Sequence, residues 1–246
     1  MGKFAVVTGA GRGIGAATSA ALVADGWTVA LMARDLGALE VLAKELGNGA
    51  IAIACDVSDP ESVAKAFVQV KKQFGRLDLL FNNAGISSPG TLLEDIAPKD
   101  FERVMAVNVG GVFYCTQQAF AIMKDQNPQG GRIINNGSIS AQVPRPNSAP
   151  YTASKHAVTG LTRSTSLDGR KYNIACGQID VGNANTNMAA DHGTGVLQAH
   201  GGMLAEPMLD PEHVAKSVVH MASLPLDANV QFMTVMATKM PYIGRG

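Results

Sequence analysis

Tyr151 and Lys155 have side chains and a spacing that suit proton transfer. On a helix, positions four apart share a face, so the lysine ammonium would lie beside the phenol. A free phenol has a pKa of about 10, and a nearby positive charge stabilises its ionised form. Such a tyrosine could donate and accept protons near neutral pH, although a Tyr–Lys pair with this spacing is also common on ordinary helices.

A glycine-rich run, residues 8–15, is a second candidate site because it follows an apolar stretch and opens a helical pattern. Where side chains are missing, backbone N–H groups and the start of a helix can approach a pyrophosphate. The run could be only a tight connection, but its place between a strand and a helix favours dinucleotide binding. The expected contacts are Gly9, Gly11, Arg12, Gly13, Ile14 and Gly15.

The end of the second β-rich run, Ala33-Arg34-Asp35, bears on the choice of dinucleotide. An acid at this position binds the ribose 2′-hydroxyl of NAD, whereas an arginine can pair with the 2′-phosphate of NADP. Arg34, with Arg12 in the glycine-rich run, therefore favours NADP(H) over NAD(H). If Asp35 faces the ribose instead of Arg34, the preference reverses.

The elements that must position these residues alternate between short β-rich runs and amphipathic helical stretches. This alternation builds a parallel sheet through crossover helices. Helices are expected around residues 101–123, after Tyr151 and near His213, besides those in the first 75 residues. Strands are expected at 4–8, 28–33, 50–54, 77–81, 132–135, 174–179 and 232–236. The predicted fold is α/β, a Rossmann fold with a doubly wound, mostly parallel seven-stranded sheet and helices on both faces.

The length and composition fit one large domain over residues 1–246. The chain is 46% hydrophobic, which is enough to bury a substantial core, and neither a linker nor an internal repeat divides it. Residues 187–210 are rich in Gly, Ala, Met and His and show little periodicity. We expect a lid over the substrate there.

The charge and the cysteine content limit the kinds of partner that the chain is expected to bind. With 20 basic and 20 acidic residues and no basic block, the chain lacks the electrostatic footprint of nucleic-acid or membrane binding. The three separated cysteines suggest neither disulfides nor a metal site, and the histidines lack metal-ligand spacing, so no metal is expected. Without a signal peptide or a membrane-length run, we expect a cytoplasmic protein with a small-molecule substrate.

Together these features resemble the single-domain branch of the short-chain dehydrogenases/reductases, and within it the 3-oxoacyl-carrier-protein reductases. The resemblance covers most of the chain. It rests on the order and spacing of Thr8-Gly9-xxx-Gly13-x-Gly15, Cys55-Asp56-Val57, Asn82-Asn83-Ala84-Gly85, Asn108, Ser138 and Tyr151-xxx-Lys155. It implies an oxidoreductase that transfers a hydride between NADP(H) and a carbonyl or secondary alcohol.

The resemblance also implies roles for individual residues. Tyr151 would be the acid/base, Lys155 would support it and reach the nicotinamide ribose, and Ser138 would hydrogen-bond the substrate oxygen. Asn108 would anchor a water behind Lys155. Ser138 could equally be a turn cap and Asn108 a satisfied core amide. Further cofactor contacts would come from Asp56, Val57, Asn83, Ala84, Gly85, Ala184 and Thr186. The resemblance also implies a homo-oligomer, either a tetramer or a dimer.

The sequence departs from the family after the sixth strand, where Val181 stands in place of the usual proline. A residue other than proline restores an N–H donor and loosens φ, so either a different network holds the nicotinamide or the lid swings more freely. Two other functions would leave different marks in the sequence. A catalytically silent NADP-binding regulatory or structural protein would be indicated by loss of Tyr151 or Lys155, and neither is lost. A sugar-nucleotide epimerase or dehydratase would have a longer chain.

Overall fold

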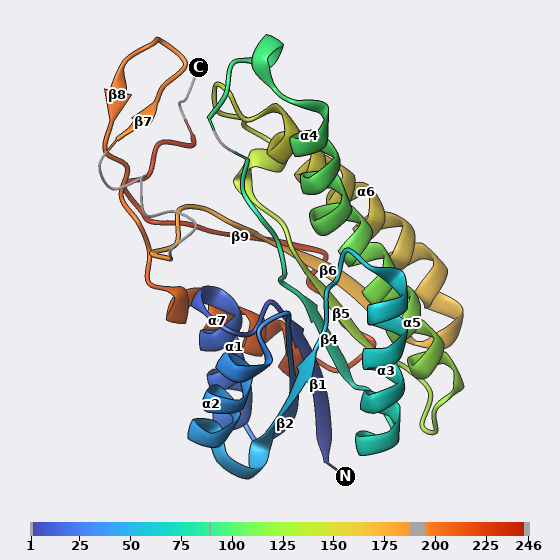
Figure 1. The fold of residues 1–246 in the computed structure, drawn as a ribbon. Coiled ribbons are helices and arrows are strands. Elements are labelled where there is room, and N and C mark those ends of the chain that lie inside the picture. The colour runs from blue at the N-terminus through green and yellow to red at the C-terminus, as the bar shows by residue number, and fades with distance from the viewer. Residues whose placement is uncertain (1, 89, 187–194, 244–246) are drawn as a thin grey trace.

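Seven parallel strands form one sheet in the order β3-β2-β1-β4-β5-β6-β9 (Figure 1). The computed structural model describes residues 2–88, 90–186 and 195–243. The strands are β1 (Lys3–Thr8), β2 (Trp27–Ala33), β3 (Ala50–Ala54), β4 (Leu79–Asn82), β5 (Gly131–Asn136), β6 (Ile174–Val181) and β9 (Phe232–Val235). The predicted Rossmann fold is confirmed.

The strand order reverses at β1, which pairs with β2 on one side and with β4 on the other. At such a point the connections leave toward opposite faces of the sheet and open a crevice at the carboxyl ends of the strands. The glycine-rich run follows β1 directly. The topology therefore places that run at the expected ligand-binding edge.

Helices cover both faces of the sheet (Figure 1). One face carries α1 (Gly13–Ala24), α2 (Leu36–Leu46) and α7 (Pro211–Ser223). The other carries α3 (Pro60–Phe74), α4 (Pro98–Met105), α5 (Gly111–Asp125) and α6 (Ala149–Gly169). A π-helical segment, η3 (Ala106–Gly110), joins α4 to α5, and short 3-10 turns lie at η1 (Gly47–Gly49), η2 (Leu93–Asp95), η4 (Ile139–Ala141) and η5 (Arg170–Tyr172).

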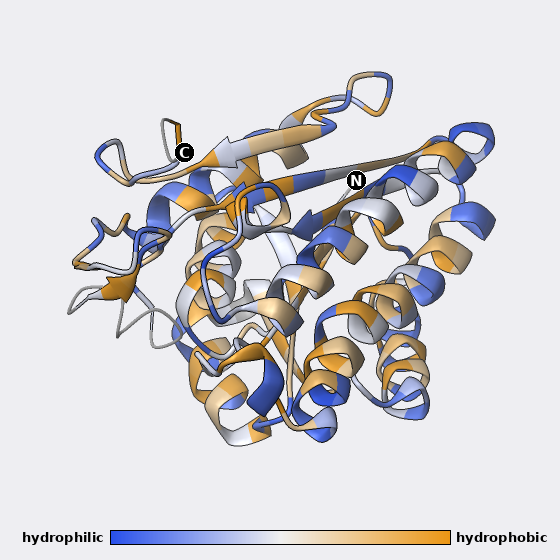
Figure 2. Cartoon of the chain, turned by 90° about the horizontal axis from the view of Figure 1, so that it is seen from above, coloured by the Kyte–Doolittle hydropathy of each residue, from blue (hydrophilic) through white to orange (hydrophobic). Residues whose placement is uncertain are grey.

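The alternation of side chains along each strand divides the core into two layers. Ala5 and Val7 of β1 pack on the α1 side with Leu22, whereas Val6 packs on the other side with Phe67 of α3. Hydrophobic and hydrophilic residues alternate around the helices (Figure 2), as expected for helices with one buried stripe. Both layers hold the sheet rigid beneath the loops at its carboxyl edge.

Several predicted boundaries were wrong by one or two residues; for example, β6 ends at Val181 rather than at Ile179. Helix α6 begins at Ala149 rather than after Tyr151, so Tyr151 lies within its first turn, where Pro150 is well tolerated. Strand β4 begins at Leu79 rather than Leu77. The N–H and carbonyl of Leu77 bind the Gln126 side chain at 2.8 and 2.9 Å instead of joining the strand ladder.

Part of the predicted lid, residues 187–194, lies outside the described residues. The rest contains a short antiparallel hairpin, β7 (Val196–Leu197) and β8 (Met203–Leu204). Its base is anchored where Leu209 bridges to Ala184, just beyond β6. The hairpin therefore departs from the same edge of the sheet as the predicted site.

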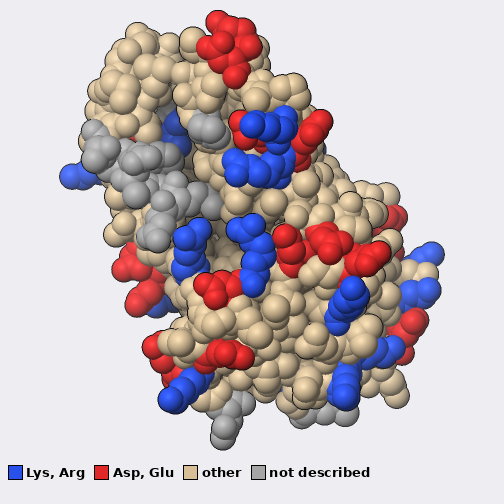
Figure 3. Space-filling model, in the orientation of Figure 1, with Lys and Arg blue, Asp and Glu red and all other residues tan. Residues whose placement is uncertain are grey.

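Basic and acidic side chains are interspersed over the face drawn in Figure 3, in line with the formal net charge of zero. Among the described residues, no helix is long and apolar enough to cross a membrane. Within the same residues, no group of three or more His, Cys, Asp and Glu side chains could hold a metal ion.

Candidate active site

The loops that follow six neighbouring strands hold the predicted cofactor residues and Ser138. The glycine-rich run follows β1, Arg34 follows β2, and Asp56 and Val57 follow β3. After β4, β5 and β6 come Asn83 to Gly85, Ser138, and Ala184 with Thr186, respectively. Because the strands are parallel, all of these residues lie at one edge of the sheet, and α6 brings Tyr151 and Lys155 to it.

The glycine-rich run packs tightly against two other loops. Gly9 and Gly13 have φ angles of 63° and 56°, a region that favours glycine. A Cβ on Gly9 would lie 2.8 Å from the Cα of Ala84, and one on Gly13 would lie 3.1 Å from Cγ2 of Thr186. The run therefore needs its glycines both for backbone conformation and for close approach.

The start of α1 differs from the starts of three other helices. Asp35, Asp59 and Asp210 cap α2, α3 and α7 by accepting a backbone N–H of the first turn. Helix α1 has Arg12 at this position, with no side-chain cap, as at the starts of α4 and α6, and no acidic residue in its first turn. Its N–H groups can serve an anion, so the residues present fit the pyrophosphate of a dinucleotide.

Asp35 and Asp56 are held by local hydrogen bonds near the predicted adenosine end. Oδ1 of Asp35 accepts from the N–H of Ala38 at 3.1 Å. Oδ1 of Asp56 accepts from Oγ and N of Ser58 at 2.7 and 2.9 Å. The Ser58 hydroxyl and N–H, together with the positive charge of Arg34, lower the pKa of Asp56 against the opposing effect of burial.

A chain of hydrogen bonds joins the glycine-rich run to the predicted catalytic lysine. Oγ1 of Thr8 accepts from the N–H groups of Asn83 and Ala84 at 2.9 and 3.0 Å, and Nδ2 of Asn83 donates to the Thr8 carbonyl at 2.9 Å. Nδ2 of Asn136 donates to Oδ1 of Asn83 at 2.9 Å. Nζ of Lys155 donates to the Asn136 carbonyl at 2.8 Å. The dinucleotide loop and Lys155 are thereby fixed to one another.

Lys155 lies beside Tyr151, as their spacing on a helix predicts. Its Nζ is 5.5 Å from the centroid of the Tyr151 ring, and the residue is only 7% exposed. An ammonium held this close stabilises negative charge on the phenol oxygen, and the effect strengthens as water is excluded.

Ser138 is also buried and caps the 3-10 turn η4. Its Oγ accepts from the N–H of Ser140 at 3.1 Å, while its own N–H donates to Oδ1 of Asp180 at 3.0 Å. A hydroxyl that accepts from the backbone can still donate its hydrogen to another oxygen. The capping role and a substrate-binding role are therefore compatible.

Asn108 lies in the π-helical segment and bridges two parts of the site. Its Oδ1 accepts from the N–H of Ile86 at 2.8 Å, and its Nδ2 donates to the Ile86 carbonyl and to Oγ of Ser154, both at 3.0 Å. Ser154 in turn donates to the Tyr151 carbonyl at 2.7 Å. The buried amide thus ties the loop after β4 to the first turn of α6.

A family model described as short chain dehydrogenase matches residues 3–196, well over half of the chain. The chain belongs to the short chain dehydrogenase family. Versicolorin reductase 1 of Aspergillus parasiticus is 39% identical over 192 residues, which is 76% of this chain and 71% of that protein. The expected family membership is confirmed.

Solved structures of similar proteins agree over nearly the whole chain. A 3-ketoacyl-(acyl-carrier-protein) reductase from Brucella melitensis, complexed with NADH, has a TM-score of 0.87 at 27% identity and covers 97% of this chain and 98% of its own. An alcohol dehydrogenase from Thermococcus sibiricus, complexed with 5-hydroxy-NADP, has a TM-score of 0.84 at 27% identity and covers 98% of both. As a member of this family, the chain is an oxidoreductase for carbonyl or alcohol substrates.

The turn at which this short chain dehydrogenase lacks the family proline is held by the sheet. Strand β6 continues through Val181, which pairs with Val235 of β9, and the N–H of Gly182 donates to the Val235 carbonyl at 2.9 Å. A β-branched residue with an N–H suits a strand, whereas proline would not continue it. The replacement therefore extends β6 by a paired residue.

Motif reading missed several residues of the site. Asn136 links Asn83 to Lys155, and Ser154 links Asn108 to Tyr151. Asp180 accepts from the N–H of Ser138. Polar residues that end or interrupt an apolar strand were the available signal for Asn136 and Asp180.

The loop that leads into α6 borders a cavity of about 280 Å³. It is lined by Thr91, Leu93, Ile96, Pro144, Arg145, Asn147, Ser148, Ala149 and Thr152. On its wall Arg145 forms an ion pair with buried Glu206 and donates to Oδ1 of Asn183 at 2.8 Å. Although burial raises the pKa of Glu206, hydrogen bonds from Gln198, Asn183 and Arg145 outweigh it and lower that pKa overall.

Proposed function

We propose that this chain is an NADP(H)-dependent oxidoreductase that interconverts a carbonyl and a secondary alcohol, with Tyr151 as acid/base. The observation that carries the proposal is the buried Lys155 ammonium, which lies against Tyr151 and is tied to the glycine-rich run through Asn136 and Asn83. Besides its hydrogen bond to the Asn136 carbonyl, the ammonium has further N–H donors for other groups. It serves a group whose negative charge appears during a reaction.

The residues would divide the chemistry among them. In reduction, the Tyr151 hydroxyl donates its proton to the carbonyl oxygen, and Lys155 stabilises the phenolate that remains. The Ser138 hydroxyl donates a hydrogen bond to the same oxygen as negative charge develops there. In oxidation, the Tyr151 phenolate accepts the alcohol proton. Bound nicotinamide supplies or accepts the hydride, and Lys155 also holds its ribose.

The hydrogen bond that Asp35 makes to the backbone supports the preference for NADP(H). Its carboxylate caps α2 by accepting from Ala38, whereas the side chains of Arg34 and Arg12 are exposed at the same edge. A capping carboxylate is occupied by the backbone, while the two guanidinium groups suit a 2′-phosphate. We propose the other dinucleotide contacts that the sequence predicts as well. They are Gly9, Gly11, Gly13, Ile14, Gly15, Asp56, Val57, Asn83, Ala84, Gly85, Ala184 and Thr186.

Nicotinamide absorbance tests the proposal, with NADPH and NADH run in parallel against ketones, diketones, quinones and 3-oxoacyl thioesters. We expect turnover with NADPH, a smaller kcat/KM with NADH, and loss of turnover in Tyr151→Phe. Arg34→Gln should lower the NADPH/NADH ratio about tenfold, since it removes one charge-assisted contact. A preference for NADH in the unaltered chain would show that Asp35 governs the ribose site.

We also propose that the chain forms a homo-oligomer, a dimer or a tetramer, through α5 and α6. Phe113 on α5 and Leu167 on α6 are large apolar side chains that are 47% and 60% exposed, and a second copy of the chain would cover them. The lid proposed for residues 187–210 would close over the substrate. Sedimentation analysis tests the assembly, and a purely monomeric chain would exclude it.

A further inference from the structure

A buried carboxylate lies beside the predicted catalytic residues without a role in the family resemblance. Asp180, next to the end of β6, is 1% exposed. Its Oδ1 accepts from the N–H of Ser138 at 3.0 Å and from Nε2 of Gln178 at 2.7 Å, and its Oδ2 accepts from Nε2 of Gln142 at 3.3 Å. A carboxylate in the interior is costly unless its surroundings favour its charge.

The fold makes room for this carboxylate at Gly137, the residue between β5 and Ser138. A Cβ on Gly137 would overlap Oδ1 of Asp180 and lie 2.6 Å from Nε2 of Gln178. The φ angle of Gly137 is not in the left-handed region, so the requirement is for space rather than conformation. Any side chain at position 137 would displace the carboxylate from Ser138.

The surroundings of Asp180 act on its pKa in opposite directions. Burial raises the pKa of Asp180 above its usual value overall, although the bonds from Gln178, Ser138 and Gln142 and the positive charge of Lys155 on α6 limit that rise. Its neighbour in β9, Thr234, is uncharged. The Tyr242 hydroxyl of the C-terminal segment donates a hydrogen bond to Gln142, and Gln142 in turn donates to Oδ2 of Asp180. Nζ of Lys155 donates to the Asn136 carbonyl, and Asp180 accepts from the N–H of Ser138 two residues later, so both charged groups bind the same short segment at the end of β5.

We propose that Asp180 is a positioning residue that fixes the backbone at Ser138 and acts as a counter-charge to Lys155, so that it controls the ionisation of Tyr151. The proposal rests on the proposed function, in which Tyr151 is the acid/base. A negative charge beside Lys155 offsets part of the ammonium's attraction for a tyrosinate.

The test is the tyrosinate absorbance of the full chain as a function of pH, with the Tyr151→Phe spectrum subtracted for each background. Asp180→Asn removes the charge but keeps one oxygen to accept from Ser138. We expect the Tyr151 midpoint to fall by about 0.5 to 1 in pH, a three- to tenfold change in the ionisation constant. The acid limb of kcat/KM for alcohol oxidation should move by the same amount.

Asp78→Asn is the matched control, because Asp78 also accepts a backbone N–H, from Phe4 at 3.0 Å, at the opposite end of the sheet. It should leave the Tyr151 midpoint in place. If circular dichroism shows that Asp180→Asn does not fold, the smaller Asp180→Ala removes the same charge and is expected to give the same change.

An unchanged midpoint in a folded Asp180 variant would overturn the proposal, as would an equal change in Asp78→Asn. Absorbance titration needs no substrate, so it tests the role of Asp180 independently of the proposed function. If the unaltered chain turns over no carbonyl or alcohol, the proposed function fails, while the titration still shows whether Asp180 controls Tyr151.

Discussion

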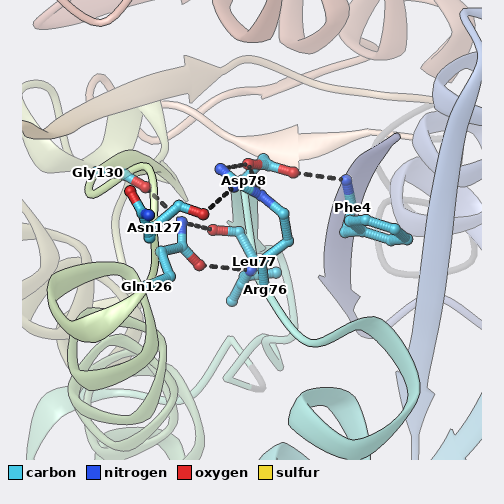
Figure 4. Close-up of polar contacts among 7 residues, drawn as sticks. All are labelled: Phe4, Arg76, Leu77, Asp78, Gln126, Asn127 and Gly130. Atoms are coloured by element: carbon cyan, nitrogen blue, oxygen red, sulfur yellow. Dashed lines mark hydrogen bonds and ion pairs between the residues drawn. The ribbon is translucent and has the colours of Figure 1, made fainter. Parts of the chain in front are cut away.

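The two ends of the sheet carry polar networks of similar size that are built for different purposes. At the amino ends, Asp78 accepts from the N–H of Phe4 and from Arg76, and Gln126 binds the backbone of Leu77 and Gly130 (Figure 4). These groups close the network on backbone and side chains of the fold itself. Such a network holds β1, β4 and the loop before β5 together.

At the carboxyl ends, the network of Thr8, Asn83, Asn136 and Lys155 instead ends beside Tyr151, the residue that we propose as the acid/base. Nζ of Lys155 lies 5.5 Å from the centroid of the Tyr151 ring, and α1 starts without a side-chain cap. A buried polar network therefore does not by itself mark a site. A functional site is marked by hydrogen-bond donors and charges that the fold holds in place and that can still bind another group.

The largest effect that separates the two ends is expected for Tyr151→Phe. The variant keeps the ring beside Lys155 and removes only the proton donor, so kcat should fall about a thousandfold. Dinucleotide affinity, measured by quenching of Trp27 fluorescence or by calorimetry, should change less than threefold. Near-normal turnover would mean that another group transfers the proton.

Lys155→Met should lower kcat about a hundredfold at neutral pH. Loss of the ammonium removes stabilisation of the phenolate, so activity should recover in part as the pH rises. Lys124→Met, at a lysine that lies over Tyr172 on the outer surface, is the control and should leave the pH profile of kcat unchanged. A profile that is the same for Lys155→Met and the unaltered chain would contradict the role of Lys155.

Gly9→Ala should weaken dinucleotide binding about tenfold, because the new Cβ would press on Ala84 at 2.8 Å and deform the run. Gly75→Ala is a matched control at the end of α3, where φ is 72° and no atom lies within 4 Å of the added Cβ. It should cost about 1 kcal/mol of stability and leave the dissociation constant of the dinucleotide unchanged. Calorimetric titration of NADPH into both variants compares them directly.

The smallest effect on activity is expected for Gln126→Leu at the amino ends. The substitution leaves the Leu77 N–H and two carbonyls without their side-chain partner, which should cost about 2 kcal/mol of unfolding free energy. For a domain of this size, the Tm should fall by about 4 to 8 °C. Turnover measured well below the Tm should stay within about twofold.

The sequence predicted those features that follow from local pattern. Strand and helix order came from hydrophobic periodicity, and the neighbouring Tyr151 and Lys155 came from helical spacing. Gln126 with Leu77, and Arg145 with Glu206, join residues 49 and 61 positions apart, and no local rule connects them. Asp180 stands out as a charged residue near the end of an apolar strand, but its partner is the backbone N–H of Ser138, which no residue type reveals.

In this molecule, the residues proposed for catalysis lie at the carboxyl edge of the sheet, whereas the polar network at the amino edge stabilises the fold. The most direct measurement takes Tyr151→Phe and Gln126→Leu through the same thermal melt and the same NADPH turnover assay. We predict a Tm close to that of the unaltered chain with turnover lost for Tyr151→Phe, and a lowered Tm with turnover kept for Gln126→Leu. Turnover kept in Tyr151→Phe, or lost in folded Gln126→Leu, would contradict the claim.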